Sequence, residues 1–140
     1  MPHAKFPCEV LTPEGETFND EVEMISTRTT LGLIAVLAHH APVLARLEPT
    51  ELRLYRNDSE ILRYAQGEGF MQVSGNHALL LVGEVTPVDE LDRAELEASR
   101  QHALSLLESA REDSEANARA TRQLRRAEAF LAILDGDGRH

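Results

Sequence analysis

Glycine and proline are confined to part of the chain, and their distribution constrains the fold more than any other feature. All six prolines lie at or before Pro87, and neither residue type occurs between Pro87 and Gly136. Because both residues mark turns and interrupt helices, the secondary structure must change near Thr86 and Pro87. The sequence therefore predicts a turn-rich domain over residues 1–86 and a helical domain over residues 87–140.

Short apolar runs separated by turn residues predict β-strands in the first domain. Two stretches, residues 52–65 and residues 70–82, each carry a central polar turn signal between two apolar runs, which predicts two hairpins. Strands at intervals of roughly 8 to 12 residues are typical of a sandwich or barrel.

The second domain carries the periodicity of two helices. Thr86 or Asp89 is predicted to cap the first helix and Ser114 the second, with Gly136 as the stop. In the second helix, apolar residues recur with the 3.6-residue period of an amphipathic helix: Ala116, Ala120, Leu124, Ala127, Leu131 and Leu134.

This alanine-rich stripe has an energetic consequence. An alanine methyl buries little apolar area, so the hairpin is expected to pack closely but weakly and to need the first domain or a partner. The predicted fold class is α+β, an N-terminal antiparallel β-sandwich followed by a C-terminal antiparallel two-helix hairpin.

The charge of the chain is acidic overall and basic in one place. A formal net charge of -10 argues against binding to nucleic acid or to an anionic membrane surface, because both need a cationic face. No apolar run approaches the roughly 20 residues that span a bilayer, so direct membrane insertion is not expected. Between residues 116 and 134, in the second helix, the charged residues are four arginines and one glutamate. This local positive charge indicates either an acidic protein partner or a solvated helix face.

Candidate catalytic and metal-binding residues lack the spacings that such sites need. His39 and His40 are adjacent, so on a strand they would point to opposite faces and could not chelate one ion. The single cysteine, Cys8, is expected to be a buried, inert thiol. The sequence contains no G-x-S-x-G elbow and no phosphate-binding loop. We therefore expect no enzyme, no metal and no cofactor, with a small enzyme or metal protein using His39, His40 or His77 as the remaining alternative.

Three segments resemble the epsilon subunit of the bacterial F-type proton-translocating ATP synthase. They are residues 10–15, residues 69–82 and Gly32 to Pro42, GLIAVLAHHAP, which is similar to the family phrase G-E-L-G-I-L-P-G-H-A-P. The first glycine and the final His-Ala-Pro match, whereas the second glycine, the first proline and the third glycine of that phrase are replaced here by Ala35, Ala38 and His39.

The resemblance implies a noncatalytic subunit of the central rotor that couples proton transport to ATP synthesis. It places the chain peripherally on the cytoplasmic face of the membrane, between the gamma shaft and the loops of the c-ring. The ring contact maps onto Gly32 and Leu33, and the shaft contact onto His40, Ala41 and Pro42. Replacing His40 is accordingly expected to weaken assembly and leave the fold intact.

The resemblance also implies a regulatory role for the helical hairpin. In the family it often inhibits ATP hydrolysis by pressing basic residues against the alpha and beta catalytic subunits. The residues suited to this role are Arg119, Arg122, Arg125 and Arg126.

Some members of the family bind ATP through the motif I/L-D-x-x-R-A at the start of the first helix. Here Leu91 to Leu96 reads LDRAEL, so the arginine falls out of register, and Asp89, Asp92 and Arg93 are the candidates for such a site. An i, i+4 acid–base pair such as Asp89 and Arg93 is equally explained as helix stabilisation. ATP as a regulatory ligand, and a free-standing nucleotide-sensing module with a helical switch, stay open as alternatives.

Overall fold

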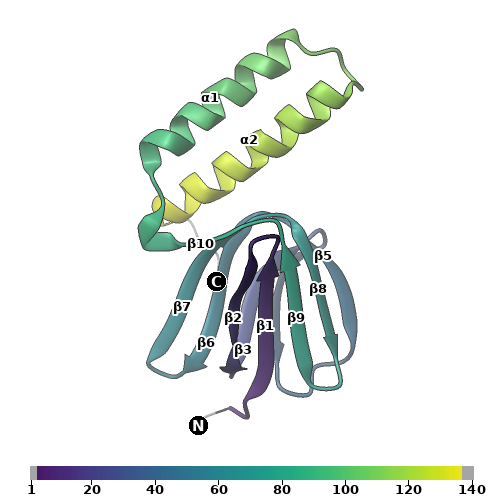
Figure 1. The fold of residues 1–140 in the computed structure, drawn as a ribbon, viewed down its shortest axis with the longest axis vertical. Coiled ribbons are helices and arrows are strands. Elements are labelled where there is room, and N and C mark those ends of the chain that lie inside the picture. The colour runs from purple at the N-terminus through teal and green to yellow at the C-terminus, as the bar shows by residue number, and fades with distance from the viewer. Residues whose placement is uncertain (1–2, 137–140) are drawn as a thin grey trace.

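The computed structural model describes residues 3–136, which form a β-sandwich followed by a helical hairpin (Figure 1). The strands are β1 (Phe6–Thr12), β2 (Gly15–Val22), β3 (Met24–Thr29), β4 (Gly32–Leu37), β5 (Val43–Leu47), β6 (Thr50–Asn57), β7 (Glu60–Gln66), β8 (Gly69–Ser74), β9 (His77–Val82) and β10 (Val85–Pro87). The helices are the 3-10 turn η1 (Val88–Glu90), α1 (Arg93–Ser109) and α2 (Glu115–Leu134). The predicted α+β class is confirmed. No helix within residues 3–136 is long and apolar enough to cross a membrane.

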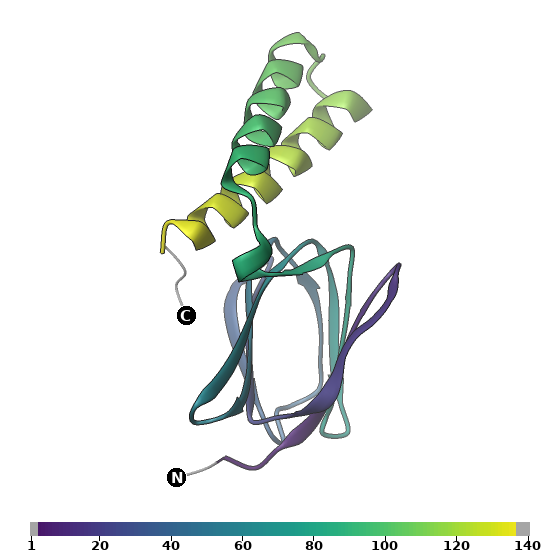
Figure 2. The same ribbon diagram turned by 60° about the vertical axis from the view of Figure 1, so that its left-hand side comes forward.

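The strands follow one continuous ladder that curls back on itself (Figure 2). Their order is β10-β7-β6-β3-β5-β8-β9-β1-β2, with β4 paired to β3. Both predicted hairpins, β6–β7 and β8–β9, are present. Among the described ladders, β1 beside β9 is parallel, whereas the sequence predicted antiparallel pairing throughout. Side chains alternate between the two faces with the same period in parallel and in antiparallel strands. The sequence pattern therefore could not show that this pair is parallel.

The sandwich core is built mainly from aliphatic side chains, as the near absence of large aromatic residues requires. Phe6, Ile25, Leu52 and Leu80 are among the fully buried members of this cluster. Cys8 lies in the same core, and burial, with a smaller effect from neighbouring Glu9, raises the pKa of its thiol to about 12. The predicted burial of the thiol is confirmed, and a raised pKa disfavours the reactive thiolate.

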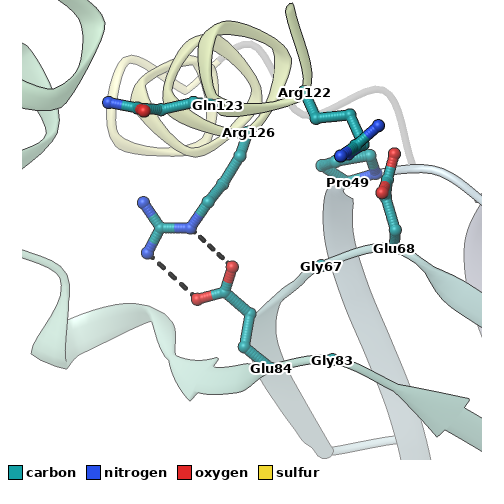
Figure 3. A pocket seen from close by; sticks show the side chains of 8 residues that line it. All are labelled: Pro49, Gly67, Glu68, Gly83, Glu84, Arg122, Gln123 and Arg126. Atoms are coloured by element: carbon teal, nitrogen blue, oxygen red, sulfur yellow. Dashed lines mark hydrogen bonds and ion pairs between the residues drawn. The ribbon is translucent and has the colours of Figure 1, made fainter. Parts of the chain in front are cut away.

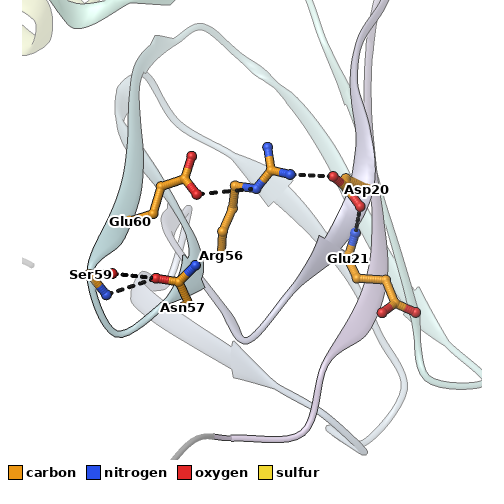
Figure 4. A network of polar contacts seen from close by, with 6 residues as sticks. All are labelled: Asp20, Glu21, Arg56, Asn57, Ser59 and Glu60. Atoms are coloured by element: carbon orange, nitrogen blue, oxygen red, sulfur yellow. Dashed lines mark hydrogen bonds and ion pairs between the residues drawn. The ribbon is translucent and has the colours of Figure 1, made fainter.

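A charged network joins β2 to the turn between β6 and β7 (Figure 4). Arg56 donates from Nη2 to Asp20 Oδ2 at 2.6 Å, and its Nε lies 3.7 Å from Glu60 Oε1. In the turn itself, Asn57 Oδ1 accepts hydrogen bonds from the backbone and hydroxyl of Ser59. These charged side chains are well exposed, so each ion pair stabilises the fold by no more than about 1 kcal/mol. The Arg56–Asp20 pair links β2 to β6.

Gly69 is required because β9 approaches its backbone closely. A Cβ at this position would lie 2.1 Å from the Leu81 carbonyl oxygen and 2.7 Å from Val82 Cα. Gly69→Ala should therefore lower the free energy of unfolding by about 3 kcal/mol, as overpacking does, measured by urea denaturation. Gly83→Ala is the matched control, because its Cβ would meet nothing closer than 3.7 Å. Equal midpoints for the two variants would contradict this account.

The helix boundaries follow local capping chemistry. Asp92 caps α1 by accepting hydrogen bonds from the backbone N–H groups of Ala94 and Glu95. The prediction of Thr86 or Asp89 as the cap was wrong, because β10 and η1 continue the chain past both residues. Ser114 caps α2 as predicted, accepting from the backbone of Asn117 at 3.1 Å.

The hairpin docks on the sandwich through the C-terminal part of α2, which packs on β6 (Figure 1). Ala65 of β7 shares a small buried cluster with Leu96 of α1 and with Phe130, Leu131 and Ile133 of α2. Of the predicted stripe, Ala120, Ala127 and Leu131 are buried and Leu124 and Leu134 half-buried, whereas Ala116, in the first turn of α2, is exposed. Phe130 and Ile133 lie outside that stripe, and both belong to the cluster that joins α2 to the sandwich.

Candidate functional site

The segment singled out from the sequence, Gly32 to Pro42, places its two predicted contact points at opposite ends of β4. Gly32 and Leu33 begin the strand, and His40 follows its end after a two-residue turn. A strand of six residues spans roughly 20 Å. The two points therefore lie far enough apart to contact different partners.

The turn before β4 presents apolar side chains to solvent. Gly32 takes φ +125°, a conformation that glycine tolerates. Leu31 is 98 % exposed and Leu33 45 %. Thr29 fixes the turn, since its hydroxyl donates to the Gly32 carbonyl and accepts from the Leu31 N–H. Together with Leu44 of β5, these residues line a groove of about 340 Å³.

The histidines occupy the turn after β4 and not a strand. His39 has φ +65°, and it stands where the family phrase carries glycine, the residue that favours this conformation. Its N–H donates to Asn76 Oδ1 at 2.7 Å, while His40 Nδ1 lies 2.7 Å from the Ala41 carbonyl oxygen. No cluster of three metal-ligating side chains occurs anywhere in the described part of the chain. The corner is thus a fixed surface feature with Ala41 and Pro42 exposed.

A second surface, which sequence reasoning missed, lies on the outer face of β5, β8 and β9. We call it the outer apolar stripe; its residues are Leu44, Phe70, Leu79 and Leu81. Leu44 is 74 % exposed, Phe70 52 % and Leu81 47 %. Phe70 is paired with Leu81, and Gln72 joins Leu44 to Leu79 across β8. The signal in the sequence was the unbroken run from Ala78 to Val82, which places apolar residues on both faces of β9.

The four arginines of α2 have different surroundings. Arg119 is well exposed, with Nη1 3.9 Å from Glu115 Oε2, and Arg122 and Arg125 are also exposed. Arg126 instead forms a two-point ion pair with Glu84, just before β10, with Nε–Oε2 and Nη2–Oε1 distances of 2.5 and 3.0 Å.

Arg126 contacts an aromatic ring of its own helix as well as Glu84. Its guanidinium also lies 4.9 Å from the centre of the Phe130 ring, within the range of a cation–π contact. The hydrogen bond to Glu84 raises the pKa of Arg126 above its ordinary value. Arg126 therefore ties α2 to the sandwich in this conformation and is not free for another partner.

The Arg126–Glu84 pair lies in a cleft of about 520 Å³ between α2 and the end of the sandwich (Figure 3). Arg122 enters the cleft beside Glu68, and Gln123 lies on its helical side (Figure 3). Each arginine in the cleft thus has a carboxylate nearby. The Arg126–Glu84 pair in this cleft joins α2 to the sandwich through charge.

The structure gives Asp89, Asp92 and Arg93 separate local contacts. Asp92 serves as the α1 cap, and Arg93 donates to Asp135 Oδ1 at 2.7 Å. Asp89 belongs to η1 and borders a hollow beside Tyr64. None of the three lines the cleft that contains Arg122 and Arg126. The nucleotide site stays a prediction.

The buried carboxylate of Glu51, on the sandwich, is paired with two arginines. Glu51 of β6 accepts hydrogen bonds at Oε2 from Arg53 Nε, at 2.9 Å, and from Arg63 Nε. Burial raises the pKa of Glu51, but the hydrogen bonds and charges of the two arginines outweigh burial and hold that pKa below its usual value. Glu51 is therefore ionised at neutral pH although its side chain is 1 % exposed.

Comparison with known proteins identifies relatives of both parts of the chain. The family described as "ATP synthase, Delta/Epsilon chain, beta-sandwich domain" matches residues 5–88. The ATP synthase epsilon chain of Levilactobacillus brevis is 32% identical over 84% of this chain and 86% of its own length. That of Herpetosiphon aurantiacus is 33% identical over 89% and 90%, respectively.

Solved structures share the fold. A chain in the mitochondrial ATP synthase of Euglena gracilis, from a structure of the OSCP/F1/c-ring, superposes with a TM-score of 0.82 at 22% identity, covering 94% of this chain and 82% of the other. A chain in the central stalk and c-ring structure of Tetrahymena thermophila ATP synthase gives a TM-score of 0.62 at 16% identity, covering 94% and 97%. At these identities the likeness establishes the architecture.

Proposed function

The chain belongs to the family of ATP synthase delta/epsilon chains, and from that premise we propose that it is a noncatalytic subunit that joins the gamma shaft to the c-ring. It thereby helps couple proton transport to ATP synthesis. In this role it is a peripheral protein on the cytoplasmic face of the membrane. Its two attachment surfaces are on the sandwich, and its regulatory element is the helical hairpin.

The outer apolar stripe is the observation that carries this proposal. Leu44, Phe70 and Leu81 place large apolar side chains in solvent on adjacent strands, and contiguous patches of this kind mark protein interfaces. The stripe lies on one face of three neighbouring strands, β5, β8 and β9, which suits a rigid partner such as the shaft. His40, Ala41 and Pro42 follow β4 and precede β5, so they extend the same docking region.

The turn at Leu31, Gly32 and Leu33 is the proposed contact with the ring. It lies one strand length away from the His40 corner. Its exposed leucines require an apolar contact at this point, in place of the charged contact that the usual family phrase, with glutamate after the first glycine, would make. The groove that includes Leu44 connects this turn with the outer apolar stripe, so shaft and ring would meet along a continuous surface.

The hairpin is the proposed inhibitor of ATP hydrolysis, acting through its arginines on acidic segments of the alpha and beta subunits. In the docked conformation Arg119 and Arg125 are exposed, Arg122 is exposed but enters the cleft beside Glu68, and Arg126 is paired with Glu84. Bringing all four to one partner requires the Arg126–Glu84 pair to separate. The hairpin is thus proposed to act as a mobile element with the observed conformation as its resting state.

Isolation of the chain from its own cells tests this function. A tagged chain expressed at its natural level should be recovered with gamma, c, alpha and beta subunits from gently solubilised membranes. ATP hydrolysis in the recovered material should be sensitive to an inhibitor of the c-ring, because the chain would join the catalytic head to the ring. Recovery of the chain free of all these subunits would refute the proposal.

A further inference from the structure

Glu51 lies on the face of β6 that the hairpin covers. Leu52 and Leu54 belong to the sandwich core, and side chains alternate along a strand, so Glu51 points to the opposite face. Its partner on β7 is Ala65, which packs with Phe130 of α2. Because α2 packs on β6 and on Ala65, the cross-strand partner of Glu51, the docked helix covers the part of the sheet in which this carboxylate lies.

The hydrogen bonds to Glu51 come from its own sheet. Arg53 and Arg63 both donate to Oε2, and the side chains of these arginines remain 22 % and 45 % exposed. Oε1 is buried and has no hydrogen-bond partner among residues 3–136. The two ion pairs can therefore persist when the hairpin leaves, whereas hydration of Oε1 requires that it leave.

A buried carboxylate oxygen without a partner destabilises the state in which it is buried. Here that state is the docked hairpin. We propose that Glu51 is a release element, a carboxylate whose burial opposes docking and keeps the hairpin able to leave the sandwich. The Arg126–Glu84 pair acts in the opposite direction, because its two members lie on α2 and on the sandwich.

This inference rests on the mobility of the hairpin in the proposed function and not on its effect on ATP hydrolysis. It is tested on the isolated full-length chain by thiol labelling. Ala65→Cys places a reporter thiol in the docking cluster, where a thiol reagent reaches it only after undocking. Native Cys8, buried in the sandwich core, reports unfolding of the sandwich in the same sample.

In the Ala65→Cys chain, Glu51→Met should slow labelling of the reporter roughly tenfold, because it removes the buried unpaired oxygen. Glu84→Gln should accelerate labelling by a similar factor, and Glu14→Met, in the exposed turn after β1, should leave it unchanged. Unchanged or faster labelling in Glu51→Met, with Cys8 still protected, would overturn the proposal.

A second variant keeps the test decisive if Glu51→Met unfolds the sandwich. If Cys8 becomes labelled in Glu51→Met, the labelling rate of the reporter thiol is measured in Glu51→Gln instead. The neutral amide of glutamine keeps the shape of the side chain and costs less to bury than a charge. Slower labelling supports the release element, and equal or faster labelling refutes it. Failure of the inhibitory proposal would appear only in the ATP hydrolysis of the assembled enzyme and would leave these labelling rates unaltered.

Discussion

Phe70→Asp should reduce binding of the chain to the gamma shaft by about 100-fold, as the loss of an aromatic anchor at the centre of an interface does. Phe70 lies in the middle of the outer apolar stripe, between Arg46 of β5 and Leu81 of β9. Aspartate would remove its apolar contact and place a charge where the partner excludes water. Because Phe70 is 52 % exposed in the isolated chain, the fold itself should change little.

Calorimetric titration of the purified chain with the gamma subunit measures the dissociation constant of each variant. Leu106→Asp is the matched control, because Leu106 is an exposed apolar residue of α1, 39 % accessible and remote from the stripe. It should bind like the original chain. Equal affinities for Phe70→Asp and Leu106→Asp would place the shaft on a different face of the sandwich.

The sandwich was predictable from the sequence wherever local chemistry decides the structure. Turn residues and alternation located both hairpins, and the usual behaviour of a free cysteine in a strand indicated the burial of Cys8. Long-range pairing was not predictable, because β1 joins β9 across most of the sandwich sequence. The outer apolar stripe was missed for a related reason, since an apolar residue on a strand does not reveal which face a partner will cover.

In the helical domain, too, local features were predictable from the sequence and long-range contacts were not. The period of α2, its Ser114 cap and its end before Gly136 all follow from neighbouring residues. The cap of α1 was misplaced because β10 and η1 occupy the residues before Asp92. Pairing of Arg126 with Glu84 joins positions 42 residues apart, so no local pattern could separate Arg126 from the three exposed arginines.

Replacing Arg119, Arg122, Arg125 and Arg126 together by alanine should raise ATP hydrolysis by the assembled enzyme several-fold. An exposed charged contact is worth about 0.5 kcal/mol, so the contacts of Arg119, Arg122 and Arg125 amount to about 1.5 kcal/mol. That difference shifts the ratio of inhibited to active enzyme by roughly tenfold. Loss of Arg126 adds little, because it also removes the docking pair with Glu84. The effect should weaken at high salt, because mobile ions screen exposed charges. Steady-state hydrolysis by the reconstituted complex measures the change.

Arg126 distinguishes inhibition from docking, because the structure gives it a role in the docked state that the other three lack. Arg126→Ala alone removes both the ion pair with Glu84 and one proposed inhibitory contact, so its two effects on hydrolysis oppose each other. Replacing only Arg119, Arg122 and Arg125 leaves the docking pair intact and should therefore raise hydrolysis more than Arg126→Ala does. Arg100→Ala on α1 serves as the control for loss of a helical arginine outside α2. If hydrolysis by the triple variant equals that of the control, the arginines of α2 do not inhibit the enzyme, and the hairpin must act through its apolar residues or not at all.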